Sequence, residues 1–337
     1  MSDNTYQVHK LYIDDKPIDL ECSGSIKFAS NNNINTMTVK IESPDIQHSS
    51  LMNKKVKLFL NAGSIDSVPI FSGYITAINP TDTHTSISCH DPRILISGKQ
   101  GIKLDINDEN NYDGYSLGAF LKETITEKVN NNETLIGLNM LNDTKPTYSL
   151  TNYRATTSIY DAAKSLINKV IDDSDFDNPL SYFFDILEGE DIAELIIKKD
   201  KSLDTSSYTF SFIDGLEKYN YTERVPTNTY TYKGGTFTYT STPTGRNNVT
   251  VQSDESRADA RNLAIVQSQL DDLVKNEIQI MINKCYHIGM GTIVNLNVDD
   301  DSIRGNHRVV GKTITFGKNM TCRLQLNKKP INFSDYI

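Results

Sequence analysis

Few residues of this chain combine the types and the spacing that catalysis or metal binding requires. Its six histidines include no HExxH or HxxxH pair, so they predict no zinc-hydrolase site. His90-Asp91 has the residue types of a general acid–base pair, but neighbouring residues on a strand point to opposite faces of a sheet. We therefore interpret the histidines as solvated or structural side chains.

Three clusters of carboxylates are candidates for metal or sugar chemistry. The alternating aspartates of Asp173–Asp177 imitate the start of a calcium-binding loop, but Phe184 stands at the twelfth position, where such a loop needs a bidentate glutamate. Glu188-Gly-Glu190 offers the paired carboxylates of a glycoside hydrolase, as any acidic chain does. Asp299–Asp301 fits an exposed turn, because like charges repel one another when buried.

Nucleophile and phosphate motifs are missing from the sequence. Gly234-Gly235 lacks the Lys-Ser/Thr of a phosphate-binding loop, and no GxSxG occurs. The cysteines form no CxxC and no Cys/His array with zinc spacing, so we predict free, buried thiols; they are Cys22, Cys89, Cys285 and Cys322. The sequence therefore predicts no catalytic residue, no metal site and no cofactor, and a protein that is not an enzyme.

Length and composition indicate a soluble protein of several modules. The chain has 337 residues, 37% hydrophobic and 23% charged, which suits two to four modules. Its net charge of −9 argues against specific nucleic-acid binding, which concentrates Lys and Arg. No apolar run approaches the roughly 18 residues of a membrane span, and the N-terminus is polar, so we expect no membrane insertion and a chain made in a cytoplasm.

Residues 1–98 alternate apolar and polar side chains in short runs separated by turn residues. This period of two is typical of strands, and several such strands predict a small β-barrel. Gly73 interrupts one run and predicts a bulge or a sharp bend there. The expected strands are Val8–Ile13, Thr36–Ile41, Val56–Leu60, Phe71–Ile78 and Thr85–Cys89.

Residues 99–178 change to a helical period and predict an α/β insertion domain. Ser116 begins a helix that runs to Val129, with apolar residues at every fourth position. Ser158 with Asp161 three residues later makes a start similar to a capping box, and the apolar stripe of this second helix ends at Val170.

From Leu180 the period returns to two, and residues 179–214 and 276–330 predict a second, split β-barrel. Between its parts, residues 215–275 form an excursion. Gly234-Gly235 predicts a tight hairpin, and the apolar spacing over Asp254–Lys275 predicts a long helix. Residues 331–337 make a C-terminal tail. The predicted fold is therefore mainly β, with α+β insertions and two similar small barrels.

Two distant stretches share a pattern at a constant offset of 238 residues, VKLFLNAGSIDSVPIFSG from Val56 and VNLNVDDDSIRGNHRVVG from Val294. Their identities and strand parity favour duplication of one barrel motif over a coincidence of generic β patterning, which stays open as the alternative. The positions taken as equivalent are Val56, Leu58, Ile65 and Gly73 in the first copy and Val294, Leu296, Ile303 and Gly311 in the second.

The order of these parts resembles the baseplate hub proteins of contractile phage tails, a family shared with phage-tail-like bacteriocins and injection systems. VPIFSGYITAINPTDTHTSISCHDP, from Val68, looks like the family's first barrel, and TTSIYDAAKSLINKVI, from Thr156, like the helix after its insertion. YHIGMGTIVNLNV, from Tyr286, with RVVGKTITF, from Arg308, is similar to its second barrel. The resemblance lies in order and texture, and no single motif is diagnostic.

The resemblance implies a structural role in the virion tail baseplate, with assembly in the host cytoplasm. Such a hub is a homotrimer, and its two barrels per chain make it a symmetry adapter between a sixfold tail tube above and a threefold central spike below. Tape-measure and baseplate wedge proteins are further implied partners. DNA passes through the lumen without specific binding, and Asp299–Asp301 are candidates for the lumen's rim.

Two other classes of function remain as alternatives. A carbohydrate-binding or adhesive β protein of a phage-like particle would use the Thr/Tyr-rich stretch Thr229–Thr240 as its contact surface. A cell-wall hydrolase is the less favoured alternative, because hubs of this kind are sometimes fused to such domains but none is recognisable here.

Overall fold

The fold is described from a computed structural model of the chain. The structure describes residues 9–28, 34–44, 50–60, 69–97, 103–106, 112–128, 136–140, 150, 153–167, 171–172, 180–187, 193–199, 206–223, 228–234, 237–240, 247–253, 276–282, 287–301, 303–318 and 320–327. The predicted mainly-β fold with small helical insertions is confirmed.

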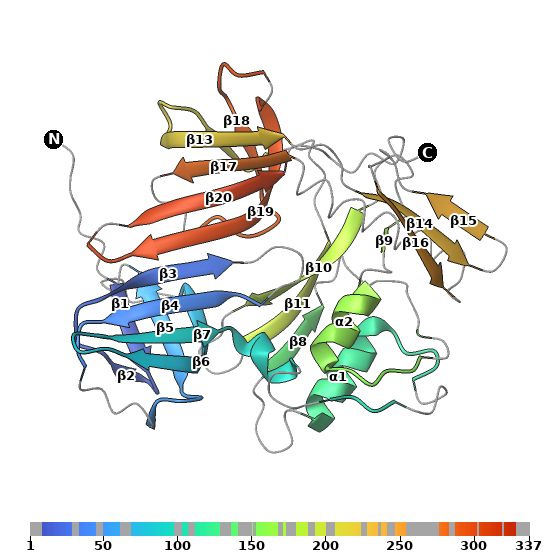
Figure 1. The fold of residues 1–337 in the computed structure, drawn as a ribbon, viewed down its shortest axis with the longest axis horizontal. Helices are drawn as coiled ribbons and strands as arrows, with labels where there is room; N and C mark the ends of the chain where they lie inside the picture. Colours follow the sequence, from blue (N-terminus) through green and yellow to red (C-terminus); the bar gives the residue numbers. More distant parts are fainter. Residues whose placement is uncertain are drawn as a thin grey trace.

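Strands from both ends of the chain join in one thirteen-stranded sheet (Figure 1). The N half-sheet comprises β1 (His9–Ile13), β2 (Lys16–Pro17), β3 (Cys22–Phe28), β4 (Thr36–Ile41), β5 (Lys55–Leu60), β6 (Phe71–Pro80) and β7 (Thr85–His90). The C half-sheet comprises β12 (Tyr208–Phe210), β13 (Leu216–Glu223), β17 (Asn276–Ile282), β18 (Ile293–Leu296), β19 (Gly305–Phe316) and β20 (Thr321–Asn327). The two half-sheets meet where β3 pairs antiparallel with β19.

Each half-sheet encloses an apolar core of its own. In the N half-sheet, Leu11 of β1 and Ile26 of β3 lie near opposite ends of the strand order yet belong to one buried cluster. In the C half-sheet, Phe210 of β12 and Leu216 of β13 do the same. Strands from opposite ends can share a core only if the sheet curls around it, as it does in small barrels. The two curled half-sheets therefore correspond to the two predicted β modules.

A separate α/β unit lies beside the large sheet. Its four-stranded sheet has the order β8 (Ile136–Met140), β11 (Ala193–Lys199), β10 (Leu180–Leu187) and β9 (Ile171–Asp172). The prediction assigned residues 179–214 to the second barrel, but the strand pairing places β10 and β11 with β8 and β9 instead. The C half-sheet begins only at β12, because an alternating pattern predicts a strand without identifying its partner.

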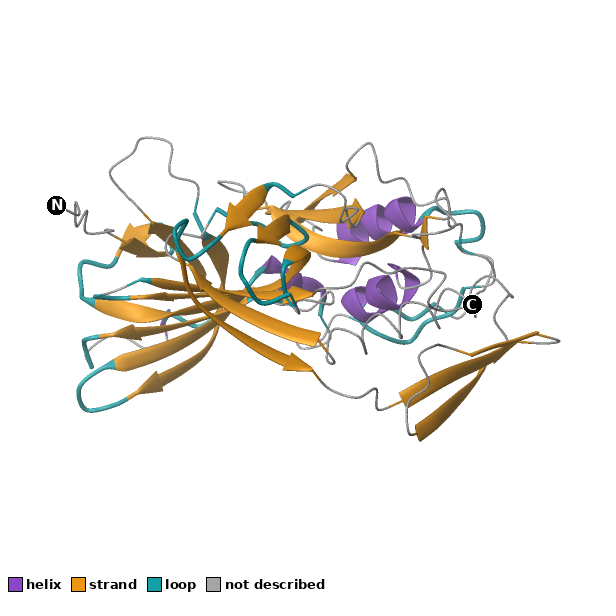
Figure 2. Cartoon of the chain, turned by 90° about the horizontal axis from the view of Figure 1, so that it is seen from above, coloured by secondary structure: helices purple, strands orange, loops and turns teal. Residues whose placement is uncertain are grey.

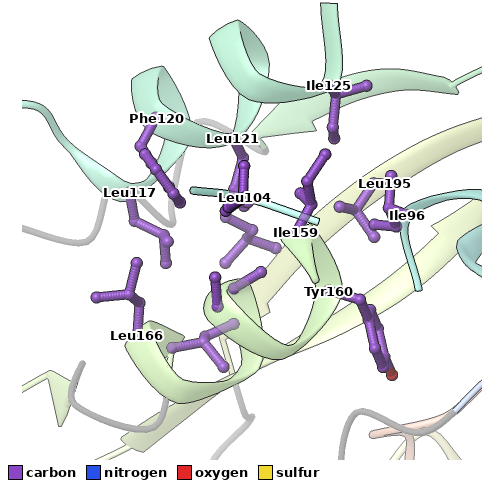
Figure 3. Packing of buried hydrophobic residues seen from close by; sticks show 14 of the residues in the cluster. Ile96, Leu104, Leu117, Phe120, Leu121, Ile125, Ile159, Tyr160, Leu166 and Leu195 are labelled. Carbon is purple, nitrogen blue, oxygen red and sulfur yellow. The ribbon is translucent and has the colours of Figure 1, made fainter. Parts of the chain in front are cut away.

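Two helices cover this small sheet, α1 (Leu117–Lys128) and α2 (Ile159–Ile167). Both agree with the predicted helices, and their apolar faces pack together in one cluster (Figure 3). The Asp161 N–H donates to Ser158 Oγ over 3.0 Å, and that hydroxyl donates to the Asp161 carboxylate over 2.6 Å. The predicted cap of α2 is therefore present, and it satisfies a backbone donor at the helix start.

A small three-stranded sheet stands apart from the other layers (Figure 2). β14 (Asn228–Gly234) pairs antiparallel with β15 (Phe237–Thr240) and parallel with β16 (Asn247–Ser253). Its last antiparallel pair joins Gly234 to Phe237, which confirms the hairpin predicted from the paired glycines. The helix predicted over 254–275 and the tail 331–337 lie outside the described residues.

A buried ion pair ties the N half-sheet to the α/β unit. Asp91 directly follows β7 and caps the 3-10 helix η2 (Pro92–Ile96), and its carboxylate accepts from Asn35 N–H over 2.7 Å. Arg93 Nε donates to both carboxylate oxygens over 3.0 Å, and the two side chains are only 0% and 2% exposed. Ile96, at the end of η2, packs in the core between α1 and α2. The pair therefore fixes the angle at which the chain leaves one layer for the next.

Tyr160 on α2 carries a buried hydroxyl without a hydrogen-bond partner among the described residues. Its ring lies at the margin of the helix core with the oxygen directed away from the leucines (Figure 3). Because a buried unsatisfied hydroxyl costs about 1–3 kcal/mol, Tyr160→Phe is expected to raise the free energy of unfolding, by about 1 kcal/mol. Ser158→Ala, which removes the cap of the same helix, should lower it by about 1 kcal/mol. Urea unfolding followed by circular dichroism distinguishes the two signs. A lower free energy of unfolding in Tyr160→Phe would show that the hydroxyl does have a hydrogen-bond partner.

Candidate functional site

The two half-sheets repeat one local arrangement of backbone. Asn53 and Gly291, which precede β5 and β18, both have positive φ, 61° and 75°. The Asn53 N–H donates to the Ile75 carbonyl over 3.0 Å, and the Gly291 N–H donates to the Val309 carbonyl over 2.9 Å. The turn before β5 is therefore bonded to β6 in the same conformation, and by the same hydrogen bond, as the turn before β18 is bonded to β19.

The return bonds and the irregularities that follow them are also repeated. Ile75 N–H donates to the Lys54 carbonyl over 3.0 Å, and Val309 N–H donates to the Thr292 carbonyl over 2.9 Å. Directly after each of these residues the register shifts, between Ile75 and Ala77 on β6 and between Val309 and Gly311 on β19. A bulge bends and twists its strand, so equal bulges give the two half-sheets the same curvature.

The full strand order is repeated as well. The N half-sheet has the order β3-β4-β7-β6-β5-β1, and the C half-sheet has β13-β17-β20-β19-β18-β12. Strand pairing matches Met37, Val39 and Ile41 of β4 with Ile278, Ile280 and Ile282 of β17, and all six side chains are buried. One difference is that β1 runs antiparallel to β5 whereas β12 runs parallel to β18. The chain thus contains one topology twice, with a changed outer strand.

The structure brings part of the predicted equivalent set to matching positions. Val56 and Leu58 on β5 correspond to Val294 and Leu296 on β18, and all four are buried. Ile303 is buried in the C half-sheet core, and Ile65 lies outside the described residues.

Gly73 and Gly311 do not occupy matching positions. Gly73 lies opposite Val56, whereas His307, and not Gly311, lies opposite Val294. The bulge predicted at Gly73 is instead found between Ile75 and Ala77. Gly73 serves a close approach of backbones, because a Cβ there would lie 2.2 Å from the His90 carbonyl oxygen.

The junction between the half-sheets is built by side chains that cross it. Phe316 belongs to β19 but packs in the core of the N half-sheet, with its ring 5.3 Å from that of His9. Gly24 makes room for it, since a Cβ there would lie 2.9 Å from the Phe316 ring and 2.1 Å from the Thr38 carbonyl. Lys312 Nζ lies 4.3 Å from the centre of the Phe28 ring, a cation–π contact across the same strand pair.

Several strand edges of the large sheet have no partner strand among the described residues, among them those of β2, β12, β13 and the end of β6. β13 is the last strand of the C half-sheet and pairs on one side only, with β17. β6 pairs with β5 through residues 71–74, so the end of β6 pairs on one side only, with β7. Unpaired edges present rows of N–H and C=O groups to which another strand can add.

The large sheet has two chemically different ends. At one end, which we call the turn end, β3 and β13 begin after short connections; at the other, the insertion end, β7 leads to the α/β unit and β13 to the three-stranded sheet (Figure 1). Most of the exposed large apolar side chains in the described residues lie in connections at the turn end, namely Leu20, Met52, Phe212 and Ile213. Ile213 is 95% exposed on a turn closed by a bond from Ser211 Oγ to the Asp214 carboxylate.

Within the part of the chain that the structure describes, the residues considered for chemistry are not assembled into a site. His90 Nδ1 contacts Thr76 Oγ1 at 2.7 Å, while Asp91 pairs with Arg93, so the two neighbours do face apart. In the described ranges no group of three or more His, Cys, Asp or Glu side chains could hold a metal ion. The clusters 173–177 and 188–190 lie outside those ranges.

The acidic run Asp299–Asp301 lies in an exposed loop, as predicted, and one of the cysteines differs from its prediction. Arg304 contacts Asp301 at 3.1 Å and Asp299 at 3.9 Å, so the exposed acidic run is partly neutralised within its own loop. Cys22 and Cys89 are free and buried, as predicted. Cys322 is disulfide-bonded, so the prediction of a free thiol is wrong at that position, and Cys285 lies outside the described residues.

The junction, the bulge on β19 and the β13 edge were missed by sequence reasoning, and the bulge on β6 lies beyond its predicted position at Gly73. One signal was available: the 238-residue offset also aligns Met52-Asn53 with Met290-Gly291, and Asn and Gly are the residues that most readily adopt positive φ. In the described part of the chain, no helix is long and apolar enough to span a membrane.

Comparison with solved structures supports the fold. A tail protein from Neisseria meningitidis superposes with a TM-score of 0.70 at 13% identity, with 98% of each chain covered. The 43 kDa tail protein of prophage MuSo2 from Shewanella oneidensis gives a TM-score of 0.68 at 10% identity, covering 98% of this chain and 100% of that one.

A third structure comes from a secretion machine. A component of the E. coli type VI secretion system, described as similar to bacteriophage T4 tail proteins, gives a TM-score of 0.61 at 10% identity, covering 96% of this chain and 78% of that one. Neither a protein-family model nor a curated protein sequence matches the chain. At these identities the likeness establishes a shared fold, and the predicted resemblance to tail and baseplate proteins is confirmed at that level.

Proposed function

We propose that this protein is the structural hub of a contractile tail baseplate, a homotrimer that joins a sixfold tail tube to a threefold central spike. The observation that carries the proposal is the duplicated half-sheet, with its repeated turn, cross-strand bonds and bulge. The shared fold with two tail proteins, one of them from a prophage, and with a type VI secretion component supports the same assignment.

Symmetry explains why duplication suits such a part. Three copies of a chain with two equivalent half-sheets present six similar units around one axis, whereas the single α/β unit and the single three-stranded sheet are each present three times. Both single-copy parts leave from the insertion end. We therefore assign the turn end to the sixfold tube and the insertion end to the threefold spike, with tape-measure and wedge proteins as further contacts in the virion baseplate.

The assigned role needs no catalysis and no specific nucleic-acid binding. DNA would pass through the lumen of the trimer, and a net charge of −9 disfavours retention of phosphates on its wall. Asp299–Asp301 remain candidates for the rim. If they face a basic surface of a partner instead, neutralising the three aspartates should weaken assembly and leave DNA passage unaffected.

Mass measurement in solution, with and without the spike protein, tests the proposal. A trimer, either of the chain alone or formed on addition of spike protein, is the expected result. A chain that stays monomeric under both conditions would contradict a hub, and glycan binding by that monomer would favour the adhesive alternative.

The assignment of the turn end makes a separate prediction. Ile213→Asp places a charge on the most exposed apolar side chain of that end and should weaken binding to assembled tail tube by about tenfold or more, without changing the oligomeric mass. Thr126→Asp, on the exposed face of α1 at the insertion end, adds the same charge and should leave tube binding unchanged. Equal effects of both substitutions, measured by co-sedimentation with tubes, would overturn the orientation.

A further inference from the structure

We propose that β13 of one copy pairs antiparallel with the end of β6 of a neighbouring copy, in the register that β3 and β19 adopt within the chain. The inference rests on the proposed trimer and specifies which edges close it. It follows from the repeat: if the half-sheets are equivalent, the contact that joins them within one chain can recur between chains.

β13 occupies the position of β3. Ile26 of β3 pairs with Met37 of β4, and Tyr221 of β13 pairs with Ile278 of β17. Met37 and Ile278 occupy matching positions, because Met37 pairs with Cys89 and Ile278 pairs with Leu326. Cys89 and Leu326 in turn pair with the residues before the two bulges, Ile75 and Val309. Beyond β3 lies β19, whereas no second strand among the described residues pairs with β13 on its far side.

The end of β6 occupies the position of the end of β19. Each strand pairs with its preceding strand before the bulge, β6 with β5 and β19 with β18. After the bulge β19 turns its freed edge to β3, through residues 312–316. On β19, Lys312 lies three residues after Val309, the last residue before the bulge. On β6, the last residue before the bulge is Ile75, so the matching stretch begins at Ile78. This part of β6 therefore offers the edge that a neighbouring β13 would cover.

The repeat fixes a register for the contact. Thr313 lies opposite Lys27 and Thr315 lies opposite Ser25 within the chain. Their counterparts place Asn79 opposite Thr222 and Thr81 opposite Asn220 of the neighbour. All four of these side chains are exposed, so a neighbouring strand meets no buried side chain that would have to move.

The contact between chains would be weaker than the junction within the chain. Pro80 stands where β19 has Ile314 and supplies no N–H, so the ladder would lack one donor. At the junction Phe316 lies opposite Gly24, which makes room for its ring. The matching positions hold Asp82 and Tyr219, so no aromatic ring of β6 would enter the core of the neighbouring copy. Such a difference suits an assembly of separately folded copies, and a proline at an edge also discourages pairing with unrelated strands.

Engineered disulfides test the register. Asn79→Cys combined with Thr222→Cys is expected to give a covalent trimer on non-reducing electrophoresis after mild oxidation, because directly opposite residues have Cβ atoms about 4.5–5.5 Å apart. Asn79→Cys combined with Asn220→Cys moves one thiol two residues out of register and should stay largely monomeric on the gel. Native thiols interfere little, since burial raises the pKa of Cys22 to about 11 and that of Cys89 to about 12.

The possible results distinguish an error in the proposed β13–β6 register from an error in the proposed trimer. A chain that is trimeric by mass but links equally in both variants, or in neither, overturns the proposed register and leaves the hub assignment intact. A second in-register pair, Thr81→Cys with Asn220→Cys, repeats the test if the first variant fails to fold. A chain that stays monomeric even with spike protein overturns both the register and the hub.

Discussion

Replacing Asp91 by alanine is expected to lower the free energy of unfolding by about 3–5 kcal/mol, because it leaves the Arg93 guanidinium buried without its carboxylate. The carboxylate also accepts from the Asn35 and Arg93 backbone N–H groups, so these donors lose their acceptor in the same step. Both side chains are essentially inaccessible, and water cannot replace the lost partner without opening η2. Urea unfolding at neutral pH measures the loss.

Two further variants show whether the uncompensated charge is the cause. Adding Arg93→Met to Asp91→Ala removes both charges and should recover part of the loss, which a double-mutant cycle measures. Lys54→Ala breaks the ion pair between Lys54 and Asp14, two side chains that are 43% and 53% exposed. This substitution should lower the free energy of unfolding by less than about 1 kcal/mol. If Asp91→Ala cost no more than Lys54→Ala, the buried pair would not hold the N half-sheet to the α/β unit.

Local patterns predicted most of the strands but not those with interrupted alternation. β3 was missed because Gly24 stands where an apolar side chain would continue the pattern, and the reason for the glycine is a backbone contact that only the folded sheet contains. β13 was missed because its register shifts between Leu216 and Lys218, which changes the parity of the apolar positions. β10 was predicted as a strand, yet its period held no information about which sheet it would join.

The sequence alignment also revealed only part of the repeat, because it holds along one strand and fails after the next loop. The offset of 238 residues aligns β5 with β18, where Val56 and Val294 occupy matching positions on equivalent strands. It fails beyond the following loop, because Gly73 pairs with Val56 while His307 pairs with Val294, and the two connections therefore differ by four residues. Loop length tolerates such changes while strand order does not, so topology preserves a duplication that sequence alignment loses.

The candidate interface was the least predictable part of the molecule. An open edge such as that of β13 is defined by the absence of a neighbouring strand, and no residue type in β13 marks that edge as open. Phe316 likewise belongs by sequence to the C half-sheet and by packing to the N half-sheet. Neither property leaves a local signature, since both depend on how the two halves of the chain meet.

Phe316→Ala is expected to cost about 3–5 kcal/mol and to uncouple the two half-sheets. The side chain is 2% exposed and lies in a core contributed otherwise by β1 and β3–β7, so its loss opens a cavity at the point where β19 meets β3. We expect the urea transition to broaden or divide, because each half-sheet keeps its own core while the link between them weakens. Hydrogen exchange should rise first in the β3 and β19 amides that face each other.

Phe212→Ala is the matched control, since it removes the same atoms from a ring that is 60% exposed and lies 6.0 Å from the Tyr219 ring. It should change the free energy of unfolding by less than about 1 kcal/mol and leave a single transition. If Phe316→Ala lowered stability while keeping one sharp transition, the half-sheets would be coupled mainly by the β3–β19 backbone ladder. That result would in turn raise the expected strength of a β13–β6 contact, because a contact between chains would reproduce the ladder although it lacks the crossing ring.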